Sequence, residues 1–433
     1  MASIAIIGTG IAGMGCGHFL HRDFKIDLYE QNDYVGGHTN TANVEEDGKQ
    51  IPIDTGFIVF NYQTYPNLVK LFNQLGVDVK PTNMSFGVQH LPSGLEYSSK
   101  NLFAQWKNYV SPRFWKLLVQ IQRFHKEAEE ILLNGKFNAW SLGDFIREKK
   151  YNDDFVHQYI VPMSSALWST PVETTLHYPV RVLVNFFKNH GLLGINTQFQ
   201  WYTVSNGSWQ YRDKLIAPFK EQICLNSKVK SITRRGNKAV VHTDLGEREY
   251  DKVILATHAD QALQLLGDCT ALEHDLLSPF EYQKNIATLH TDESVMPKLR
   301  NTWSAWNYRV QHVHGKLTAT TVYDMNILQQ VSDKQNYFVS INDPGLIDKS
   351  KVIRTIHYDH PIFTPGTAAA QERLDQLNRN GVTYFCGSYF RFGFHEDALT
   401  SAVDVCNSIL GHDVWAEKAE DIREEARLIT SIA

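Results

Sequence analysis

Apolar and small residues at the start of the chain predict a strand, a helix and a second strand. Residues 3–7 (Ser-Ile-Ala-Ile-Ile) carry no charge and are rich in β-branched side chains, which is typical of a strand covered on both faces in a parallel sheet. Residues 11–21 are small and apolar and predict a helix packed closely on that sheet, and 26–30 (Ile-Asp-Leu-Tyr-Glu) predict the next strand. This order indicates one βαβ unit.

Alternating apolar and polar residues return in the middle of the chain. The three runs 228–233, 239–243 and 250–256 are separated by turn residues and predict a β-meander. Residues 382–386 (Val-Thr-Tyr-Phe-Cys) predict a further strand, and 396–410 predict a helix that begins beside acidic residues, where the helix dipole favours them. We therefore expect an α/β fold.

Two long segments, 81–204 and 276–377, lack the βαβ spacing and are richer in aromatic residues. They predict a second domain, of α+β type, that is inserted in two pieces into the first. The first domain then consists of 1–80, 205–275 and 378–433. The length of 433 residues fits two to four domains at roughly 100–200 residues each.

Composition and charge restrict the class of protein. The 43% hydrophobic and 21% charged residues are typical of a globular protein, and the net charge of −5 argues against binding to nucleic acid. The five cysteines are scattered without a C-x-x-C pair, so neither a disulfide framework nor a thiolate zinc site is expected. The sequence shows neither a secretory signal nor the roughly 18 apolar residues of a membrane span. We expect a cytoplasmic protein.

The glycines after the first predicted strand form a candidate phosphate site, with the pattern Gly8-x-Gly10-x-x-Gly13. Gly8 permits a tight turn, Gly10 lets the backbone approach a pyrophosphate, and Gly13 allows close contact between helix and strand. The N–H groups at the helix start then bind the anion. Glu30, at the end of the next strand, is placed to accept hydrogen bonds from both ribose hydroxyls of an adenosine. The motif predicts a dinucleotide without deciding which one.

The residues after Glu30 favour FAD. Gln31-Asn32-Asp33-Tyr34-Val35-Gly36-Gly37-His38-Thr39 resembles the double-glycine signature of FAD-dependent oxidoreductases in the flavin-containing amine oxidase superfamily, which also contains protoporphyrinogen oxidases and phytoene desaturases. Segments 54–57, 253–257 and 385–401 resemble three further motifs of that family. These are an acid-x-glycine turn beside the isoalloxazine, a strand ending in Ala-Thr, and a strand followed by a glycine and a helix.

The resemblance implies that the first domain is a Rossmann-type FAD-binding domain with a β-meander and that the inserted segments form an amine oxidase-like substrate domain. Gly387 would meet the pyrophosphate, and the backbone amides of His395 and Ala398 would point at the flavin N1/C2 carbonyl edge, where a helix N-terminus stabilises reduced flavin. The sequence departs from the family at His38, where most relatives have arginine, and at Asp397, where glycine is usual. The cofactor-binding residues implied are Gly8, Gly10, Ile11, Ala12, Gly13, Glu30, Gln31, Gly36, Gly37, His38, Thr39, Gly56, Phe57, Val229, Ala256, Thr257, Gly387, His395, Glu396, Asp397 and Ala398.

The resemblance also bears on the substrate side. Flavoenzymes of this family take a hydride from a substrate C–H bond onto flavin N5, so the site needs an apolar slot more than acids and bases. Amine oxidases of the family carry a lysine near N5. The best register places Asn285 there and turns Lys284 to the other face, so the amine-linked machinery is incomplete. We expect Asn285, Trp306 and Tyr389 to face the substrate and assign no catalytic residue.

Residues 101–126 combine basic and aromatic side chains. Lys107, Arg113, Lys116, Arg123 and Lys126 alternate with aromatic residues, and no acidic residue is present. One interpretation is a peripheral contact with an anionic membrane surface. The other is an amphipathic helix over the core with a solvated basic edge.

Five segments resemble a subfamily of predicted NAD/FAD-binding proteins similar to the N-terminal region of fused cyclopropane fatty-acyl synthases. These are 37–41, 54–61, 189–193, 303–308 and 393–397. The resemblance implies an FAD-dependent oxidoreductase that transfers hydride from a hydrophobic substrate, a lipid acyl chain, as a desaturase, oxidase or isomerase. Two alternatives stay open: a conventional flavin amine oxidase, and a flavin-bound partner of a lipid-modifying methyltransferase without turnover of its own.

His357-x-x-His360 has the spacing of metal ligands. No further ligand residues cluster near it in the sequence, and Pro361 follows it directly. We therefore expect no metal site.

Overall fold

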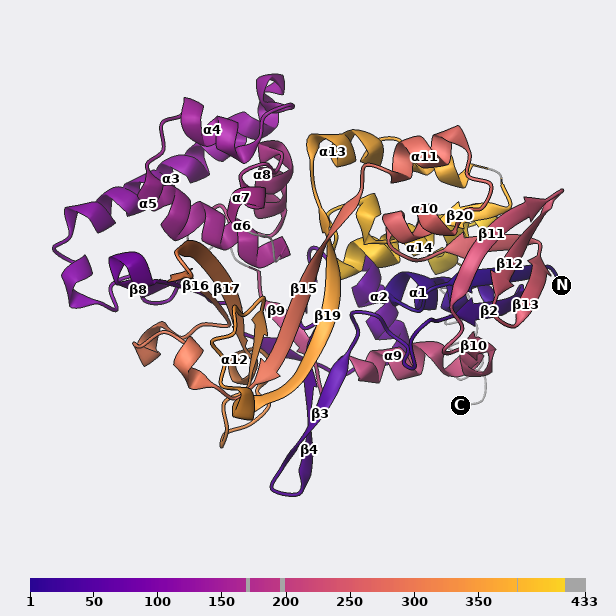
Figure 1. The fold of residues 1–433 in the computed structure, drawn as a ribbon, viewed down its shortest axis with the longest axis horizontal. Helices are drawn as coiled ribbons and strands as arrows, with labels where there is room; N and C mark the ends of the chain where they lie inside the picture. Colours follow the sequence, from indigo (N-terminus) through magenta and orange to yellow (C-terminus); the bar gives the residue numbers. More distant parts are fainter. Residues whose placement is uncertain (169–171, 195–198, 380, 417–433) are drawn as a thin grey trace, which may run out of the picture. The chain divides into compact units, whose positions relative to one another are not determined.

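The computed structural model describes residues 1–168, 172–194, 199–379 and 381–416. The chain divides into two compact units. Unit 1 comprises Met1–Thr39, Tyr211–Phe280 and Ala369–Ala433, and unit 2 comprises Asn40–Gln210 and Glu281–Ala368. Each unit is built around its own sheets, whose strands are labelled in Figure 1.

Unit 1 contains a five-stranded parallel sheet with the order β10-β2-β1-β14-β20. Its strands are β1 (Ser3–Ile7), β2 (Lys25–Tyr29), β10 (Ile223–Cys224), β14 (Lys252–Leu255) and β20 (Thr383–Phe385). Helix α1 (Ile11–Leu20) connects β1 to β2 and confirms the predicted βαβ unit. Ile4 and Ile6 are fully buried, because β1 lies between two strands and both of its faces are covered.

Helix α14 (His395–Leu410) packs along α1, as Figure 1 shows. The small residues of α1 permit this approach, since a Cβ on Gly15 would lie 3.0 Å from Leu399 Cδ1. The other helices of this unit are α10 (Ala259–Leu265), α11 (Ala271–Leu277) and most of α9 (Trp209–Ile216). Helix α13 (Pro365–Gln371) spans the boundary between the units.

The β-meander differs from the prediction in its third strand. The antiparallel sheet consists of β11 (Val229–Arg235), β12 (Lys238–Thr243) and β13 (Gly246–Tyr250). The predicted third run, 250–256, instead supplies β14 of the parallel sheet. The prediction was wrong because β13 (Gly-Glu-Arg-Glu-Tyr) is an edge strand with four exposed residues and lacks apolar alternation, whereas β14 is largely buried.

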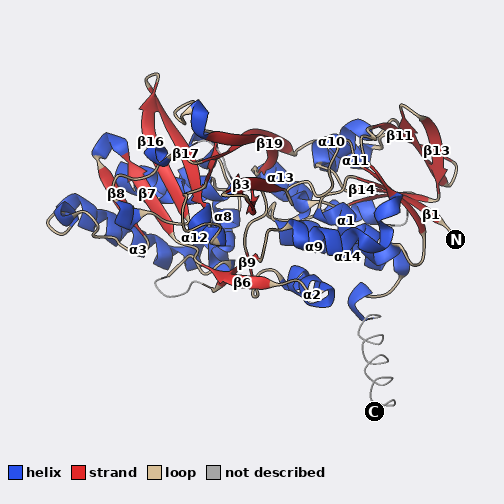
Figure 2. Cartoon of the chain, turned by 90° about the horizontal axis from the view of Figure 1, so that it is seen from below, coloured by secondary structure: helices blue, strands red, loops and turns tan. Residues whose placement is uncertain are grey.

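Unit 2 contains a seven-stranded mixed sheet with the order β19-β15-β18-β17-β16-β7-β8. Figure 2 shows β7, β16 and β17 side by side; β7 and β16 run parallel. The strands are β7 (Phe86–His90), β8 (Leu95–Ser98), β15 (Glu281–His290), β16 (Trp306–Val313), β17 (Lys316–Asp324), β18 (Phe338–Ile341) and β19 (Val352–Ile362). Smaller sheets pair β3 (Thr41–Glu46) with β4 (Lys49–Asp54), and β9 (Trp201–Val204) with β5 (Phe60–Asn61) and β6 (Val79–Thr82).

The helices of unit 2 fall mainly between β8 and β9 in the sequence. They are α2 (Pro66–Leu75), α3 (Pro112–Leu133), α4 (Leu142–Glu148), α5 (Asp153–Phe155), α6 (Val161–Trp168), α7 (Val172–Thr175), α8 (Val180–Asn189) and α12 (Met325–Gln329). The longest, α3, begins at Pro112 after the N-cap Ser111, whose hydroxyl accepts a hydrogen bond from Phe114 N–H. Among the described residues, no helix is long and apolar enough to cross a membrane.

The unit boundaries differ from the predicted domains chiefly at 40–80. The prediction groups this segment with the FAD-binding domain, whereas the structure places it in unit 2. The physical reason is packing: Val44 and Ile53 of the β3–β4 hairpin share one apolar core with Leu289 and Val339 of the large sheet. The assignment of unit 1 to the cofactor and of unit 2 to the substrate stays a prediction.

Candidate cofactor site

The segment that leads from β1 into α1 requires glycine at two positions. Gly8 has φ +100° and donates its N–H to Tyr29 O at 2.8 Å, and a Cβ there would lie 2.7 Å from Ala256 O. A Cβ on Gly13 would lie 1.9 Å from Gly8 O. Any larger residue at Gly13 therefore collides with backbone, which is the close contact of helix and strand that the motif predicts.

Gly10 differs, because a Cβ built on it meets nothing within 4 Å. Its backbone is extended, with φ −64° and ψ 178°, so no strain requires glycine here. Gly37, with φ +57°, lies against it, since a Cβ on Gly37 would come 3.3 Å from the Gly10 Cα. The first loop and the double-glycine segment thus meet beside an open space, into which a pyrophosphate could approach the backbone of Gly10.

Glu30 is buried directly after β2 and is held by two neighbours. Oε2 accepts hydrogen bonds from Thr9 N (3.2 Å) and Thr9 Oγ1 (2.5 Å), and Oε1 accepts from Asn32 N (3.0 Å) and Asn32 Nδ2 (2.8 Å). A carboxylate has about four acceptor positions, so these bonds fix its orientation. Ribose hydroxyls can take the places of the rotatable Thr9 hydroxyl and Asn32 amide, which fits the predicted role of Glu30.

The double-glycine segment is tied to the first loop. Gly36 N donates to Thr9 O at 3.1 Å, and Thr39 N donates to Gly36 O at 2.9 Å. Gly36 has φ +128°, and a Cβ there would lie 2.4 Å from Thr39 O and 3.2 Å from the Arg212 side chain. Gln31 is exposed and His38 is half-buried.

Tyr211 connects this segment to the final helix, and sequence reasoning missed it. Its hydroxyl hydrogen-bonds the Thr39 hydroxyl and lies 2.6 Å from His395 Nε2. Burial lowers the pKa of His395 to about 3, so the imidazole is neutral at physiological pH. A neutral imidazole at the start of α14 adds no charge beside a bound flavin. Positions 39, 211 and 395 are too distant in the sequence for any local pattern to indicate this contact.

The first turn of α14 holds a buried acid. Asp397 Oδ2 accepts hydrogen bonds from Phe394 N (2.9 Å) and Phe392 N (3.2 Å), and desolvation by burial raises the pKa of Asp397 to about 7. Glu396 is also buried and accepts a bond from Thr400 Oγ1 at 3.2 Å. Ala398 N donates to Phe394 O at 3.1 Å, so contact with a flavin requires sharing this donor.

The carboxyl ends of β1, β14 and β20 meet at the same loop. Ala256 N donates to Ile7 O at 2.9 Å, which places Ala256 and Thr257 beside the glycine turn. Gly387 N donates to Ser401 Oγ at 2.8 Å, and a Cβ on Gly387 would lie 3.1 Å from Thr257 O. Open α/β sheets bind ligands outside these strand ends.

Val229 begins β11 and is buried. Two residues before it, Ser227 N donates to the backbone oxygen of Glu30 at 2.8 Å, so the start of the meander is tied to the main chain at Glu30. The predicted contact of Val229 with adenine stays a prediction.

Taken together, these contacts bring the predicted cofactor residues of unit 1 to one set of loops at the carboxyl ends of its parallel strands.

Gly56 and Phe57 belong to unit 2. Just before them, Asp54 is fully buried and accepts hydrogen bonds from Ser208 N (2.9 Å), Thr41 Oγ1 (2.5 Å) and Gln329 Nε2 (2.6 Å). Burial raises the pKa of Asp54. This carboxylate therefore organises the core of unit 2, and the flavin contact of Gly56 and Phe57 stays a prediction.

The three predicted substrate-facing residues lie in different surroundings. Tyr389 is buried in unit 1, with its ring 5.3 Å from that of Phe280. Trp306 is half-buried in unit 2, with its ring 5.6 Å from that of Tyr323. Asn285 is buried on β15, and its role stays a prediction.

The histidine and cysteine side chains that could bind a metal or a cofactor are in contact with other side chains of the protein. His360 Nδ1 lies 2.9 Å from Asn285 Nδ2, and no group of three metal-ligating side chains occurs among the residues that the structure describes. Cys16 and Cys386 are buried, with 3.8 Å between their sulfur atoms. The contact with Cys16 and, after it, burial raise the pKa of the Cys386 thiol, so it acts as a packing residue.

The comparison with protein families decides the class of enzyme. The family described as flavin containing amine oxidoreductase matches residues 11–295, more than half of the chain. The chain belongs to this family. This flavin amine oxidoreductase is thus an FAD-dependent oxidoreductase, as the sequence predicted. None of the curated proteins matches it significantly.

Solved structures confirm the fold class of this flavin amine oxidoreductase. Putrescine oxidase bound to putrescine matches with a TM-score of 0.68 and 13% identity, over 95% of this chain and 99% of that one. Cyclohexylamine oxidase from Brevibacterium oxydans IH-35A matches with a TM-score of 0.69 and 14% identity, over 94% and 99%. A CLA-producing fatty acid isomerase from P. acnes matches with a TM-score of 0.67 and 16% identity, over 93% and 97%.

The residues of this flavin amine oxidoreductase fit FAD. Gly10 leaves open the space that a pyrophosphate needs, and the Glu30 carboxylate is aligned by donors that ribose hydroxyls can replace. The isoalloxazine would meet the first turn of α14, where His395 is neutral. Bound FAD supplies an acceptor for two electrons and a proton, in the form of a hydride.

Proposed function

We propose that this FAD-dependent oxidoreductase acts on a hydrophobic substrate, a lipid acyl chain, from which it removes a hydride as a desaturase, oxidase or isomerase. A substrate C–H bond would break and its hydrogen leave as a hydride, for which bound FAD would be the acceptor. Loss of a proton from the adjacent carbon then gives the double bond of a desaturated product, and return of the hydride to another carbon gives an isomer. The chain itself binds the cofactor, holds it in a fixed orientation and surrounds the substrate with neutral side chains. The observation that carries this choice of substrate is the environment of Asn285.

Asn285 lies on the buried face of β15, whereas Lys284 beside it is exposed. The Asn285 Oδ1 accepts a hydrogen bond from Asn342 Nδ2 at 2.7 Å, and its Nδ2 lies 2.9 Å from His360 Nδ1. By resemblance, amine oxidases have a lysine at this position. A buried amide does not titrate near neutral pH, so it cannot take a proton from a substrate ammonium group. An acyl chain brings no such proton.

Two further observations support an acyl substrate. The fatty acid isomerase from P. acnes has the same fold, so this fold is compatible with a fatty acid. The subfamily resemblance to the N-terminal region of fused cyclopropane fatty-acyl synthases points to the same substrate class. A cytoplasmic enzyme that touches the membrane surface through 101–126 would meet such chains where they occur.

The second candidate is a conventional amine oxidase. Putrescine oxidase and cyclohexylamine oxidase share the fold of this chain. The incomplete amine machinery at Asn285 argues against this candidate. A flavin-bound partner of a lipid-modifying methyltransferase, without turnover, stays a prediction.

Anaerobic mixing of the FAD-loaded protein with lipids and amines separates these functions. We expect linoleate or a phosphatidylglycerol to bleach the visible flavin band, or linoleate to be recovered with a displaced double bond, and putrescine and cyclohexylamine to have no effect. The lipid products are extracted and identified by mass spectrometry. Bleaching by an amine alone would establish the second candidate. Intact flavin and unchanged lipid after every addition would contradict both oxidoreductase candidates and favour the partner without turnover.

A further inference from the structure

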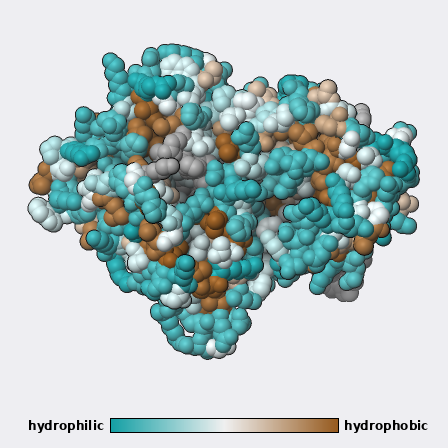
Figure 3. All heavy atoms as spheres, viewed as in Figure 1, coloured by the Kyte–Doolittle hydropathy of each residue, from teal (hydrophilic) through white to brown (hydrophobic). Residues whose placement is uncertain are grey.

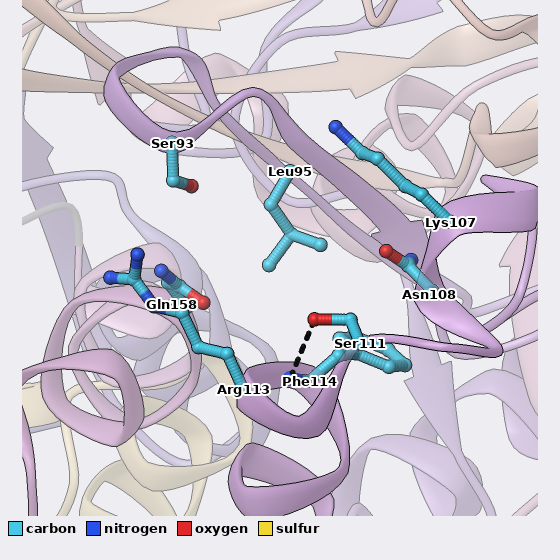
Figure 4. Close-up of a pocket in the computed structure, with 8 residues that line it drawn as sticks. All are labelled: Ser93, Leu95, Lys107, Asn108, Ser111, Arg113, Phe114 and Gln158. Carbon is cyan, nitrogen blue, oxygen red and sulfur yellow. Dashed lines mark hydrogen bonds between the residues drawn. The ribbon is translucent and has the colours of Figure 1, made fainter.

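A pocket of about 220 Å³ lies in unit 2, near β8 and the start of α3. Its lining includes the cationic side chains Lys107 and Arg113 and the neutral polar side chains of Ser93, Asn108 and Ser111. Figure 4 shows Lys107 and Arg113 on opposite sides of the open space, with Leu95 between them and the polar side chains of Ser93, Asn108 and Ser111 around its edge. Cations together with hydroxyl and amide donors are the groups that bind phosphate oxygens.

The donors of this pocket are only partly used within the protein. Lys107 Nζ donates to Gly94 O at 3.0 Å, and an ammonium group has three protons to donate. Arg113 pairs with Asp154 through Nε (2.6 Å) and Nη2, which leaves three of its five N–H groups. The Ser111 oxygen accepts from Phe114 N–H at 3.3 Å, so its own proton can be donated. Lys107 and Arg113 together carry one more charge than the single carboxylate of Asp154 that pairs with Arg113. The pocket therefore favours an anion.

The segment that carries Lys107 and Arg113 also carries several exposed apolar side chains. We call Trp106, Tyr109, Val110 and Trp115 the aromatic tip; the exposed fractions of Trp106 and Val110 are 78% and 71%. Val119, on the next turn of α3, is also exposed. At the left edge of Figure 3, over the segment between β8 and α3, hydrophobic and intermediate spheres stand among hydrophilic ones.

The aromatic tip is ordered by its own contacts. The ring of Phe103 stacks on Tyr109 at 4.5 Å and lies 5.3 Å from that of Trp115, and Trp115 Nε1 donates to Tyr109 O at 2.9 Å. Tyr109 and Trp115 are therefore held in place by contacts within this segment, while Trp106 and Val110 extend into solvent.

Packing of α3 on the core does not explain this surface. The buried face of α3 already contains Phe114, Leu117 and Phe124. The structure thus shows the amphipathic helix of one sequence interpretation and, in addition, an apolar surface that this helix does not bury. Among the described residues, Lys107 and Lys116 form no ion pair, so the positive charge beside the tip is not neutralised.

We propose that the aromatic tip docks on an anionic phospholipid membrane and that the pocket of Lys107 and Arg113 binds a phosphate headgroup of that membrane. Tryptophan and tyrosine are enriched at the headgroup depth of bilayers, and nearby lysines are attracted to anionic lipid. The pocket adds a specific headgroup contact to this surface, which a basic helix edge alone would not have. The proposal concerns unit 2 alone and does not depend on the acyl substrate.

Vesicle sedimentation of the FAD-loaded protein tests the proposal without a measurement of activity. The vesicles contain phosphatidylcholine alone, or phosphatidylcholine with one third phosphatidylglycerol. We expect binding to the anionic vesicles only, a fall of about fivefold for Lys107→Gln, and a larger fall for Trp106→Ser with Val110→Ser. Lys126→Gln is the matched control, because it removes the same charge from α3 about 20 Å beyond the start of that helix. An unchanged flavin spectrum shows that each variant is folded.

Each outcome supports or overturns a stated part of the proposal. Equal losses for Lys107→Gln and Lys126→Gln would overturn the headgroup pocket and leave only a general charge effect. Equal binding to both vesicle types, or to neither, would overturn membrane docking. Binding of glycerol phosphate without binding to vesicles would assign the pocket to a soluble ligand. Self-association that Trp106→Ser abolishes, without vesicle binding, would assign the tip to a second copy of the chain.

Discussion

At the scale of single residues, Gly10 and Gly13 carry opposite constraints although only two positions separate them. A Cβ on Gly13 would lie 1.9 Å from backbone, whereas one on Gly10 meets no protein atom within 4 Å. We therefore expect Gly13→Ala to lower the free energy of unfolding by about 2–4 kcal/mol, as overpacking against backbone does. Gly10→Ala should leave the stability of the apoprotein within about 0.5 kcal/mol and weaken FAD binding at least about tenfold. Urea unfolding and FAD titration measure these effects.

Gly135→Ala is the control for this pair. It lies in unit 2, and a Cβ there would meet nothing closer than 4.0 Å, so neither stability nor FAD affinity should change much. If Gly10→Ala bound FAD as tightly as the wild type, the open space beside Gly10 would not be the pyrophosphate site.

At the scale of elements, local patterns predicted the strands and helices whose burial is uniform. The strands of the first βαβ unit and β20 were predicted because they are short, mainly apolar runs, and α1 because its residues are small and apolar. Helix α14 was predicted from the period of its apolar face and the acidic residues at its start. The third meander strand was missed because an exposed edge strand has no such period. Tyr211 was missed because its partners Thr39 and His395 are 172 and 184 positions away. Contacts of that kind arise only when the whole sheet is assembled.

The first turn of α14 makes stability depend on pH. Burial raises the pKa of Asp397 from 3.8 to about 7. Between these values the unfolded chain releases this proton and the folded chain keeps it, so Asp397 lowers the stability as pH rises through that range. Asp397→Asn keeps an oxygen for the Phe394 N–H and does not titrate. The variant should gain stability relative to the wild type between pH 4 and 7, by at most about 1.4 kcal/mol per pH unit.

Urea unfolding of the FAD-saturated proteins at several pH values measures this difference. Asp404→Asn, further along the same helix, provides the comparison. Burial also raises the pKa of Asp404, but this carboxylate is less buried than that of Asp397. A difference between Asp397→Asn and the wild type that stays constant from pH 4 to pH 7 would show that Asp397 is already ionised in the folded protein.

At the scale of the whole molecule, the predicted cofactor residues come from three separate segments of unit 1 and from one short segment of unit 2. Thr39, Tyr211 and His395 join the three segments of unit 1 through consecutive hydrogen bonds. The Rossmann domain could be predicted because its motifs are local. The predicted boundary at 80 differs from the unit boundary in the structure, which falls after Thr39. The packing of 40–80 depends on strands far along the chain, which no local pattern shows.

Removal of FAD should therefore affect the two units unequally. A ligand at a hundred times its dissociation constant stabilises the structure that it contacts by about 2.7 kcal/mol. In hydrogen exchange of the apo and FAD-loaded proteins, peptides that contain 8–13, 30–39 and 387–398 should gain the most protection, because these loops surround the candidate site. Peptides of α3 should change little and serve as the internal reference, and Gly10→Ala at the same FAD concentration should lose most of the gain. A gain that is largest at 54–61 would place the main cofactor contacts in unit 2, and the glycine loops would then have a structural role alone.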